Sequence, residues 1–379
     1  MAEWQTRWTQ NPLIAISWGF KSLLGHIGNK EYYMNKLKIM SSRPHIGQHI
    51  SQIIAGFLSL HEKGHLDFNI NVCYDKIIPF PVPHLIEAEI EGRRIAFDMC
   101  DGYANTDALE AYIDNVDYYF KRSFSTKKNT FYPKTIQQKI YPLGFNYHVT
   151  HFNNPIESLF SIKALLAGPA NLHYPIKQIA KMIKGYGRDR YYTQDKFEKM
   201  AEHKKDNIKI LYLTRLWENQ EISITRIKLV RELKKYFKNH FIGGVDNKPY
   251  ARKTCPDLIV SPDFTRRPKY LNIMHQSDIC IGTTGLHESI GWKTGEYIAA
   301  SRAIVHEKFI YEVPGHFSEG KNYLEFETID QCLEKVHHLF ENPDALYSMK
   351  LANQQYYESW LKPEKLVENA LEIVRKSNT

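Results

Sequence analysis

The sequence predicts an α/β protein with two doubly wound, Rossmann-like domains that face each other across a cleft. Its 379 residues exceed what a single hydrophobic core usually supports, so two compact domains are expected. Two separate stretches, which begin at Lys36 and Ile208, follow the order strand, loop, helix, strand. That order builds a parallel sheet covered by helices. A hydrophobic fraction of 43% and a charged fraction of 24% are ordinary for a globular protein.

The first stretch combines several strands with one clear amphipathic helix. Apolar residues recur at helical spacing from Ile50 to Leu60, and Gly64 is expected to end that helix. Strands are predicted at residues 36–40, 66–72, 85–90, 94–98 and 139–143. Together these elements predict one domain over residues 36–150.

The second stretch opens with a continuous apolar strand at residues 208–213, a pattern typical of a strand buried on both faces. Further strands are predicted at residues 240–243, 257–260, 278–282 and 303–306. Helices are predicted at residues 227–237, 292–300, 328–341, 344–358 and 363–375. Most of these elements form a second predicted domain, over residues 206–355.

Two segments fall outside the predicted domains. Residues 151–205 are rich in lysine, tyrosine and glycine and are interpreted as a linker with a helical insertion. Residues 1–35 contain tryptophans among basic residues, which form either a surface for a membrane or partner, or aromatics that pack onto the first domain. The start lacks the features of a secretory signal, and no run approaches the ~20 apolar residues that span a bilayer. We therefore expect a cytoplasmic protein, with peripheral contact at the inner face of the membrane left open.

Charge and cysteine usage narrow the class of partner. The formal net charge of +8 favours an anionic partner such as a lipid surface, a nucleic acid or a nucleotide phosphate. The five cysteines lack CxxC pairing, and most stand in apolar runs. They are therefore interpreted as reduced thiols of a cytosolic protein, without a disulfide or zinc role.

The most informative segment is residues 282–307. A buried strand is predicted to end at Gly282, and a helix opens near Gly291 after a loop of small residues. In open parallel sheets, ligands bind beyond the carboxyl ends of strands, and a helix N-terminus there favours a diphosphate. The residues that leave room for such a group are Thr283, Thr284 and Gly285, together with Gly291.

Two carboxylates, Glu288 and Glu296, bracket this loop and helix start with seven residues between them. The segment resembles the E-x7-E motif of GT-B glycosyltransferases of the group 1, family 4-like kind. In that family the first glutamate holds hydroxyls of the donor sugar, and the second holds the ribose of the nucleotide. The resemblance implies that Glu288 orients the sugar and that Glu296 accepts from the ribose. The alternative is that both glutamates only lie on a solvated helix face.

The resemblance extends over most of the chain. The sequence Leu-Thr-Arg-Leu ending at Leu216 resembles the family's strand that ends in Gly-Arg-Leu, which implies that Arg215 meets the diphosphate with its fork of donors. The family's following lysine is absent, because Gln220 stands near that position, and Lys293 is expected to substitute. Arg226 is a weaker candidate, expected on the exposed face of a helix. Residues 356–379 are expected to be helices that cross back to the first domain.

In the first domain, residues 41–49 stand where the family places its glycine-containing loop and first helix. There Gly47 would let the backbone approach the donor phosphates or the acceptor closely. His45 and His49 are candidates for an acid, a base or an acceptor contact, or are simply polar surface groups. Asp101 follows a predicted strand, and it either contacts the acceptor hydroxyl or forms part of a turn.

The sequence contains no D-x-D, zinc-ligand cluster, phosphate loop or nucleophile turn, so we expect no metal and no cofactor. The co-substrate would be a nucleoside diphosphate sugar, in particular a UDP-sugar. The resemblance implies a retaining, hexosyltransferase-like enzyme of polysaccharide biosynthesis that acts on a glycan, a lipid-linked intermediate or another hydroxyl acceptor. Two alternatives stay open. One is a glucosyltransferase acting on nucleic-acid bases, which the charge and the 24 tyrosines would suit. The other is a nucleotide-sugar-binding protein without turnover.

Overall fold

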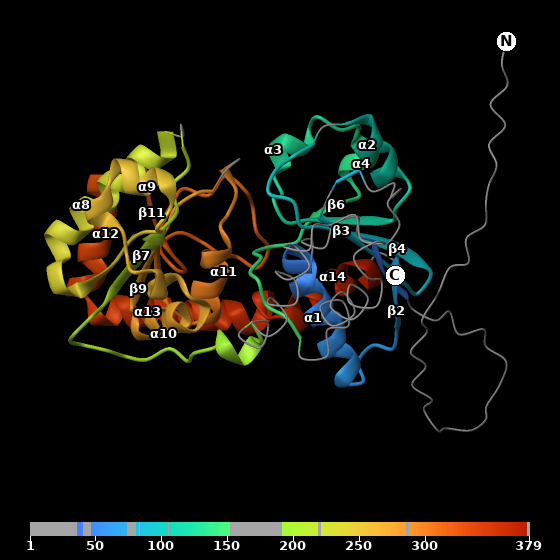
Figure 1. Ribbon diagram of the computed structural model, residues 1–379. Helices are drawn as coiled ribbons and strands as arrows, with labels where there is room; N and C mark the ends of the chain where they lie inside the picture. The colour runs from blue at the N-terminus through green and yellow to red at the C-terminus, as the bar shows by residue number, and fades with distance from the viewer. Residues whose placement is uncertain are drawn as a thin grey trace, which may run out of the picture.

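The protein contains two separate β-sheets, each covered by helices on both faces (Figure 1). The computed structural model describes residues 36–40, 47–73, 81–82, 84–104, 106–151, 192–218, 221–285 and 288–376. The predicted α/β class is thereby confirmed, while the exact domain boundaries stay a prediction. Among the helices of the described residues, none is long and apolar enough to cross a membrane.

The first sheet is mixed and has the strand order β2-β1-β3-β4-β5-β6. Its strands are β1 (Lys36–Met40), β2 (Asn69–Cys73), β3 (Leu85–Ile90), β4 (Arg93–Asp98), β5 (Tyr118–Lys121) and β6 (Ile140–Pro142). Strand β3 is antiparallel to both β1 and β4, whereas the remaining pairs are parallel. The turn between β3 and β4 consists of Glu91 and Gly92, both at positive φ, which closes a tight hairpin.

The second sheet is entirely parallel, with the order β11-β10-β9-β7-β8. Its strands are β7 (Ile210–Thr214), β8 (Phe241–Val245), β9 (Ile279–Gly282), β10 (Ala303–Glu307) and β11 (Leu324–Phe326). The chain adds β8 on one side of β7 and then β9 on the other side. The direction of winding therefore reverses between β7 and β9, which is where open α/β sheets bind ligands.

One predicted strand of the second domain, residues 257–260, is wrong. Residues 256–258 form a short 3₁₀ turn instead, and Ile259 makes only an isolated bridge to Val245. Pro256 begins the turn, and its ring removes the N–H that a ladder would need. Conversely, the four-residue strand β5 was not predicted.

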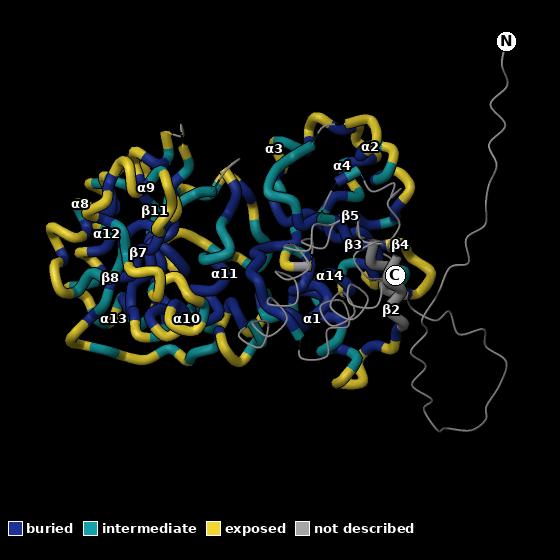
Figure 2. The backbone as a smooth tube through the Cα atoms, in the orientation of Figure 1, coloured by how far each residue is buried: buried dark blue, intermediate teal, exposed yellow. Residues whose placement is uncertain are grey.

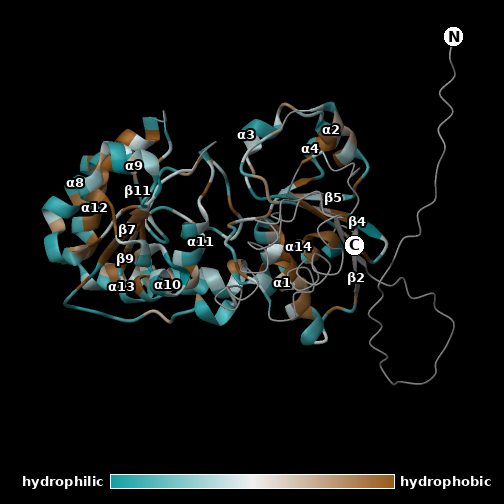
Figure 3. Cartoon of the chain, viewed as in Figure 1, coloured by the Kyte–Doolittle hydropathy of each residue, from teal (hydrophilic) through white to brown (hydrophobic). Residues whose placement is uncertain are grey.

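Each sheet and the helices on its two faces form three layers. In the first unit they are α1 (Gly47–Glu62), α2 (Asp107–Asp114), α3 (Thr126–Asn129) and α4 (Lys134–Gln137). In the second they are α8 (Glu221–Phe237), α9 (Pro249–Thr254), α10 (Arg267–Gln276), α11 (Trp292–Ala299), α12 (Ile329–Glu341) and α13 (Pro343–Tyr356). After a π-helical turn at Tyr357–Leu361, α14 (Pro363–Lys376) covers the first sheet again. Buried residues are concentrated in the strands, whereas exposed residues are frequent in the outer helices (Figure 2). Hydrophobic residues are likewise concentrated in the strands and hydrophilic residues on the outer helices (Figure 3).

The last helix returns to the first sheet and packs against α1, so that the blue helix α1 and the red helix α14 lie side by side (Figure 1). The buried residues of α14 that join this core include Leu366, Val367, Ala370, Leu371 and Val374. A glycine is required where the helices meet, because a Cβ at Gly56 would lie 2.3 Å from the carbonyl oxygen of Pro363.

The chain passes between the two cores at two places. Leu143 packs in the core of the first sheet, and Phe145 in a core of the second. At the other crossing, Leu361 packs with the second sheet and Leu366 with the first. Gly144 has a φ of 112°, and a Cβ there would lie 3.7 Å from Leu366 Cδ1. The two connections therefore lie next to each other.

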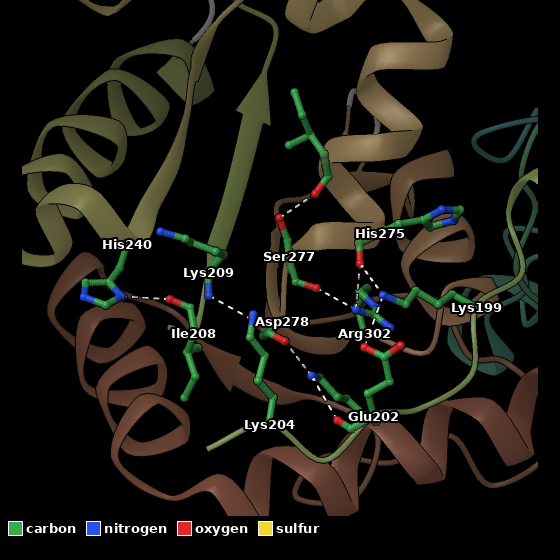
Figure 4. A network of polar contacts seen from close by, with 12 residues as sticks. Lys199, Glu202, Lys204, Ile208, Lys209, His240, His275, Ser277, Asp278 and Arg302 are labelled. Atoms are coloured by element: carbon green, nitrogen blue, oxygen red, sulfur yellow. Dashed lines mark hydrogen bonds and ion pairs between the residues drawn. The ribbon is translucent and has the colours of Figure 1, made fainter. Parts of the chain in front are cut away.

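A buried ionic network joins the amino ends of the second sheet's strands (Figure 4). Asp278, just before β9, accepts from Lys350 Nζ at 2.7 Å and from Lys204 Nζ at 2.9 Å. Burial alone would raise the pKa of Asp278, but these two ammonium groups outweigh it and hold the pKa below its ordinary value. Arg302, just before β10, donates to the carbonyl of Ser277 at 2.7 Å. This network is at the sheet edge opposite to the carboxyl ends.

Candidate functional site

The candidate site lies at the carboxyl ends of β7 and β9, where the winding of the second sheet reverses. Thr283 follows β9, and its Oγ1 accepts from Tyr212 of β7 at 3.3 Å. Thr284 donates both its N–H and its hydroxyl to Glu307 Oε2, each at 2.7 Å, which fixes the loop to β10. Gly285 donates its N–H to the Ser289 carbonyl at 2.8 Å, so the loop forms a tight turn before α11.

This turn requires a glycine at position 285, because a side chain would collide with Ser289. A Cβ there would lie 2.7 Å from the Ser289 hydroxyl oxygen and 3.3 Å from its carbonyl oxygen. Gly291 is the N-cap of α11, with open space around it and no side-chain cap bond. Among the residues that the structure describes, no side chain caps the first N–H groups of α11, and helix N-termini of this kind favour an anion.

Lys293, in the first turn of α11, points back toward β7. Its ammonium donates to the carbonyl of Leu213. Burial lowers the pKa of Lys293 to about 8, so that most of the amine is still charged at neutral pH. The sequence prediction of a cation beside the helix start agrees with this position, whereas its contact with a phosphate stays a prediction.

Arg215 follows β7 directly and keeps most of its side chain in solvent. Its Nε donates to Asp246 Oδ2 at 3.0 Å, and 60% of the side chain is exposed. Asp246 stands immediately after β8. The carboxyl ends of β7, β8 and β9 thus meet at one edge of the sheet, and Arg215 is an accessible cation there.

The prediction for Arg226 is wrong, because this side chain is buried and only 4% exposed. It lies on the same face of α8 as Leu229, Val230 and Leu233, which pack into the core. Its guanidinium donates to the carbonyl of Arg215 at 2.9 Å and to that of Thr284 at 2.7 Å. Its helical spacing to Leu229, Val230 and Leu233 could have indicated that Arg226 is buried.

Glu296 is buried in the second turn of α11, so a solvated helix face is excluded for it. Its Oε1 accepts from Arg267 Nη2 at 2.9 Å. Its Oε2 is buried and accepts no hydrogen bond from the residues that the structure describes. The guanidinium of Arg267 lies about 5 Å from the ring centres of Tyr192, Phe197 and Tyr270.

Glu288 differs from Glu296 in almost every respect. It is exposed and has a φ of 60°, a left-handed conformation that is unusual for a glutamate. Its Oε2 lies 3.4 Å from Nζ of Lys128, a residue of α3 in the first unit. Leu286 and His287, just before it, lie outside the described residues. The two predicted donor carboxylates therefore lie on either side of the start of α11, Glu288 in solvent and Glu296 in the interior.

Asp101 is connected to the donor loop through a single arginine. The buried guanidinium of Arg122 pairs with Asp101 and also donates to the carbonyl of Ile290, just before α11. Arg122 follows β5 and Asp101 follows β4, so both come from the carboxyl edge of the first sheet. This bridge brings the candidate acceptor residue next to the candidate donor loop.

The histidine prediction is tested only in part. His45 lies outside the described residues, and Gly47 is the first residue of α1. His49 stacks on His84 with ring centroids 3.8 Å apart and meets Trp292 of α11 edge-on at 4.8 Å. Burial lowers the pKa of the His49 ring to about 4, so it is neutral near pH 7.

Four arginines and lysines of this region escaped the sequence analysis or were misjudged by it: Arg122, Lys128, Arg226 and Arg267. Each reaches its partner across a long sequence separation, so the partner is not visible in the local sequence, although the helical spacing to core residues marks the buried face for Arg226. Within the part of the chain that the structure describes, no group of three or more His, Cys, Asp or Glu side chains is arranged to hold a metal ion.

No protein-family model matches the sequence, and no curated protein matches it. The structure is similar to that of a putative UDP-N-acetylglucosamine 2-epimerase from Listeria monocytogenes, with a TM-score of 0.39, 13% identity and coverage of 90% of this chain and 96% of that one. It is also similar to HepE from Anabaena in complex with UDP-glucose, with a TM-score of 0.39, 12% identity and coverage of 90% and 100%.

A glycosyltransferase from Rickettsia africae is similar at a TM-score of 0.37 and 12% identity, with coverage of 91% of this chain and 99% of that one. TM-scores below 0.5 establish neither a shared fold nor a shared activity. The class of this protein is therefore defined by its own sheets and site. It is a two-sheet α/β protein in which Arg215, Lys293 and the start of α11 lie at the switch point of the parallel sheet.

Proposed function

We propose that the protein is a glycosyltransferase that takes its sugar from a nucleoside diphosphate sugar. One observation carries the proposal: Arg215, Lys293 and the uncapped start of α11 meet at the carboxyl ends of β7 and β9. A diphosphate needs both positive side chains and free N–H groups, and this edge offers them together. The E-x7-E resemblance supports the choice of a sugar nucleotide.

The two glutamates take different roles in this proposal. Exposed Glu288 receives hydroxyls of the donor sugar, and its strained backbone supports a positioning role, since such strain is concentrated at functional sites. Glu296 receives the ribose through Oε2, which accepts no hydrogen bond from the described part of the chain. Because Oε2 is buried, the nucleotide has to displace the side chains that cover it. Arg267 keeps the other oxygen of Glu296 in place.

The transfer step requires no nucleophile from the protein. The bond between the anomeric carbon and the diphosphate oxygen breaks, and a bond from the same face to the acceptor oxygen forms, with retention of configuration. The acceptor proton passes to the departing diphosphate oxygen. Arg215, Lys293 and the helix start stabilise the leaving diphosphate in place of a metal. The acceptor is a hydroxyl of a glycan or lipid-linked intermediate, and Asp101 lies on its side of the site.

The decisive experiment is an assay of a panel of nucleoside diphosphate sugars for slow hydrolysis and for transfer to simple glycan acceptors, with a chelator present. We expect one donor to be consumed, and Arg215→Ala to suppress its consumption. Arg231→Ala is the matched control, because Arg231 is also exposed on the second unit but pairs with Asp257, away from this edge. If no donor is consumed and calorimetry detects no nucleotide binding, the proposal is wrong.

A further inference from the structure

Arg226 is a buried cation that stands directly behind the candidate anion site. Its side chain leaves the second turn of α8 and runs beneath the loops that follow β7 and β9. Among the residues that the structure describes, no carboxylate forms an ion pair with it, and its Nε has no hydrogen-bond partner. A buried guanidinium without a carboxylate is costly unless its surroundings compensate. Such a group therefore calls for a functional explanation.

The contacts of Arg226 join the two loops of the site. One nitrogen of the guanidinium, Nη1, donates to the carbonyl of Arg215, and Nη2 donates to the carbonyl of Thr284. The plane of the guanidinium also stacks on Trp217, with 4.7 Å between Cζ and the ring centre. A planar fork can hold two carbonyls at a fixed separation, which an amine cannot do. The loop after β7 and the loop after β9 are thus tied to one rigid group.

We infer that Arg226 is a positioning residue of the proposed donor site, which sets the relative position of Arg215 and the Thr283–Thr284 loop while remaining out of reach of the ligand. The inference rests on the proposed function for its link to nucleotide binding. The part of the inference that concerns the positions of the two loops does not depend on the proposed function. Arg226 also keeps a positive charge behind the site, which favours an incoming anion.

The charge of Arg226 acts on the ammonium of Lys293. Burial is the main cause that lowers the pKa of Lys293 to about 8, and the positive charge of Arg226 lowers it further. The other groups that face the Lys293 amine are Glu296 of α11, Asp246 after β8, Arg215 after β7 and the ring of Tyr270 in α10. A variant that removes the charge of Arg226 should therefore raise the pKa of Lys293, whereas one that keeps the charge should not.

Two variants separate these effects. Arg226→Met removes both the fork and the charge, whereas Arg226→Lys keeps the charge and can reach only one carbonyl. We expect both to weaken UDP binding by about tenfold or more, because a small misplacement of binding groups is expensive. Only Arg226→Met should move the alkaline limb of the binding profile to higher pH. Arg231→Met, on the same helix with an exposed side chain, is the control.

Hydrogen exchange tests the loops without any ligand. The amide of Trp217 donates to Ser223 Oγ and that of Thr284 to Glu307, so both should be protected in the native protein. Faster exchange of these amides in both Arg226 variants, with unchanged exchange in β10, supports the inference. Unchanged exchange overturns it, whatever happens to the affinity. If exchange responds but wild-type protein binds no nucleotide, the proposed function fails and the positioning role stands.

Discussion

At the residue scale, Lys293 is the cation of the site whose charge changes near physiological pH. Burial lowers its pKa to about 8, so its ammonium form is present below that pH and is lost above it. The charged form attracts the diphosphate. We therefore expect UDP affinity to fall as the pH rises through about 8, with a somewhat higher midpoint in the complex. Calorimetry from neutral to alkaline pH measures this, and Lys293→Gln should flatten the alkaline limb. A flat wild-type profile contradicts the role.

Glu288 and Glu296 should respond differently to substitution because one is exposed and the other is paired. Glu288→Ala should reduce binding and turnover of the sugar nucleotide while free nucleotide binds almost normally. Glu296→Gln should weaken both ligands by about 1.5–3 kcal/mol, the value of a hydrogen bond to a charged group. Glutamine is preferable to alanine here, because its amide oxygen can still accept the hydrogen bond from Arg267, whereas alanine would leave the buried guanidinium without any acceptor at this position. Calorimetry measures the binding of the nucleotide and of the sugar nucleotide, and an assay of sugar transfer measures turnover. The assignment is lost if both variants bind the sugar nucleotide like wild type.

The residue scale is also where the sequence was least informative. The strand and the loop of small residues correctly predicted that a helix starts near Gly291, and the structure begins α11 at Trp292. The sequence could not show that Glu296 is buried, since this depends on Arg267, which comes from another helix. Arg226 was misjudged for a related reason: a charged side chain was expected to face solvent, although it shares a face with core leucines.

At the element scale, apolar patterns predicted most strands and the longer helices, whereas α2, α3, α4, α9 and α10 were not predicted. The helix expected at residues 363–375 is α14, Pro363–Lys376, because its apolar residues recur along one face. Strand β5 was missed because it is only four residues long and ends in Lys121. The charge of Lys121 is tolerated inside the protein because Asp98 of the neighbouring strand accepts from it at 2.7 Å. Such a partner is visible only once the strands are paired.

The end of β9 leads to a prediction about packing. Gly282 lies beside His306 of β10, and a Cβ at Gly282 would be only 2.1 Å from the His306 ring. Gly282→Ala should therefore lower the free energy of unfolding by about 1–3 kcal/mol through overpacking. It should also disturb the loop that carries Thr283. Gly291→Ala is the control, since no atom lies within 4 Å of a Cβ there. Thermal unfolding compares them, and equal midpoints would show that His306 moves away freely.

At the scale of the whole molecule, the sequence predicted two α/β units and a return of the last helices to the first unit, but not the individual contacts by which the units meet. The fold class followed from the repeated order of strands and helices, which is local information. The meeting of the units depends on contacts such as Arg122 with Ile290 and Thr126 with Glu312, far apart in sequence. Most of the segment that the sequence analysis interprets as a linker, residues 151–205, lies outside the described residues.

The adjacent crossings at Gly144 and between Leu361 and Leu366 give the two units a shared axis about which they can close on a nucleotide. Closure would exclude water from the activated sugar. Since Arg122 bridges the first sheet and the loop before α11, we expect it to hold the closed form. Small-angle scattering should show a smaller radius of gyration when UDP is added. Arg122→Gln should abolish this decrease, whereas Arg93→Gln, on an exposed pair within the first sheet, should preserve it. An unchanged wild-type curve at saturating UDP would mean that the two units do not move.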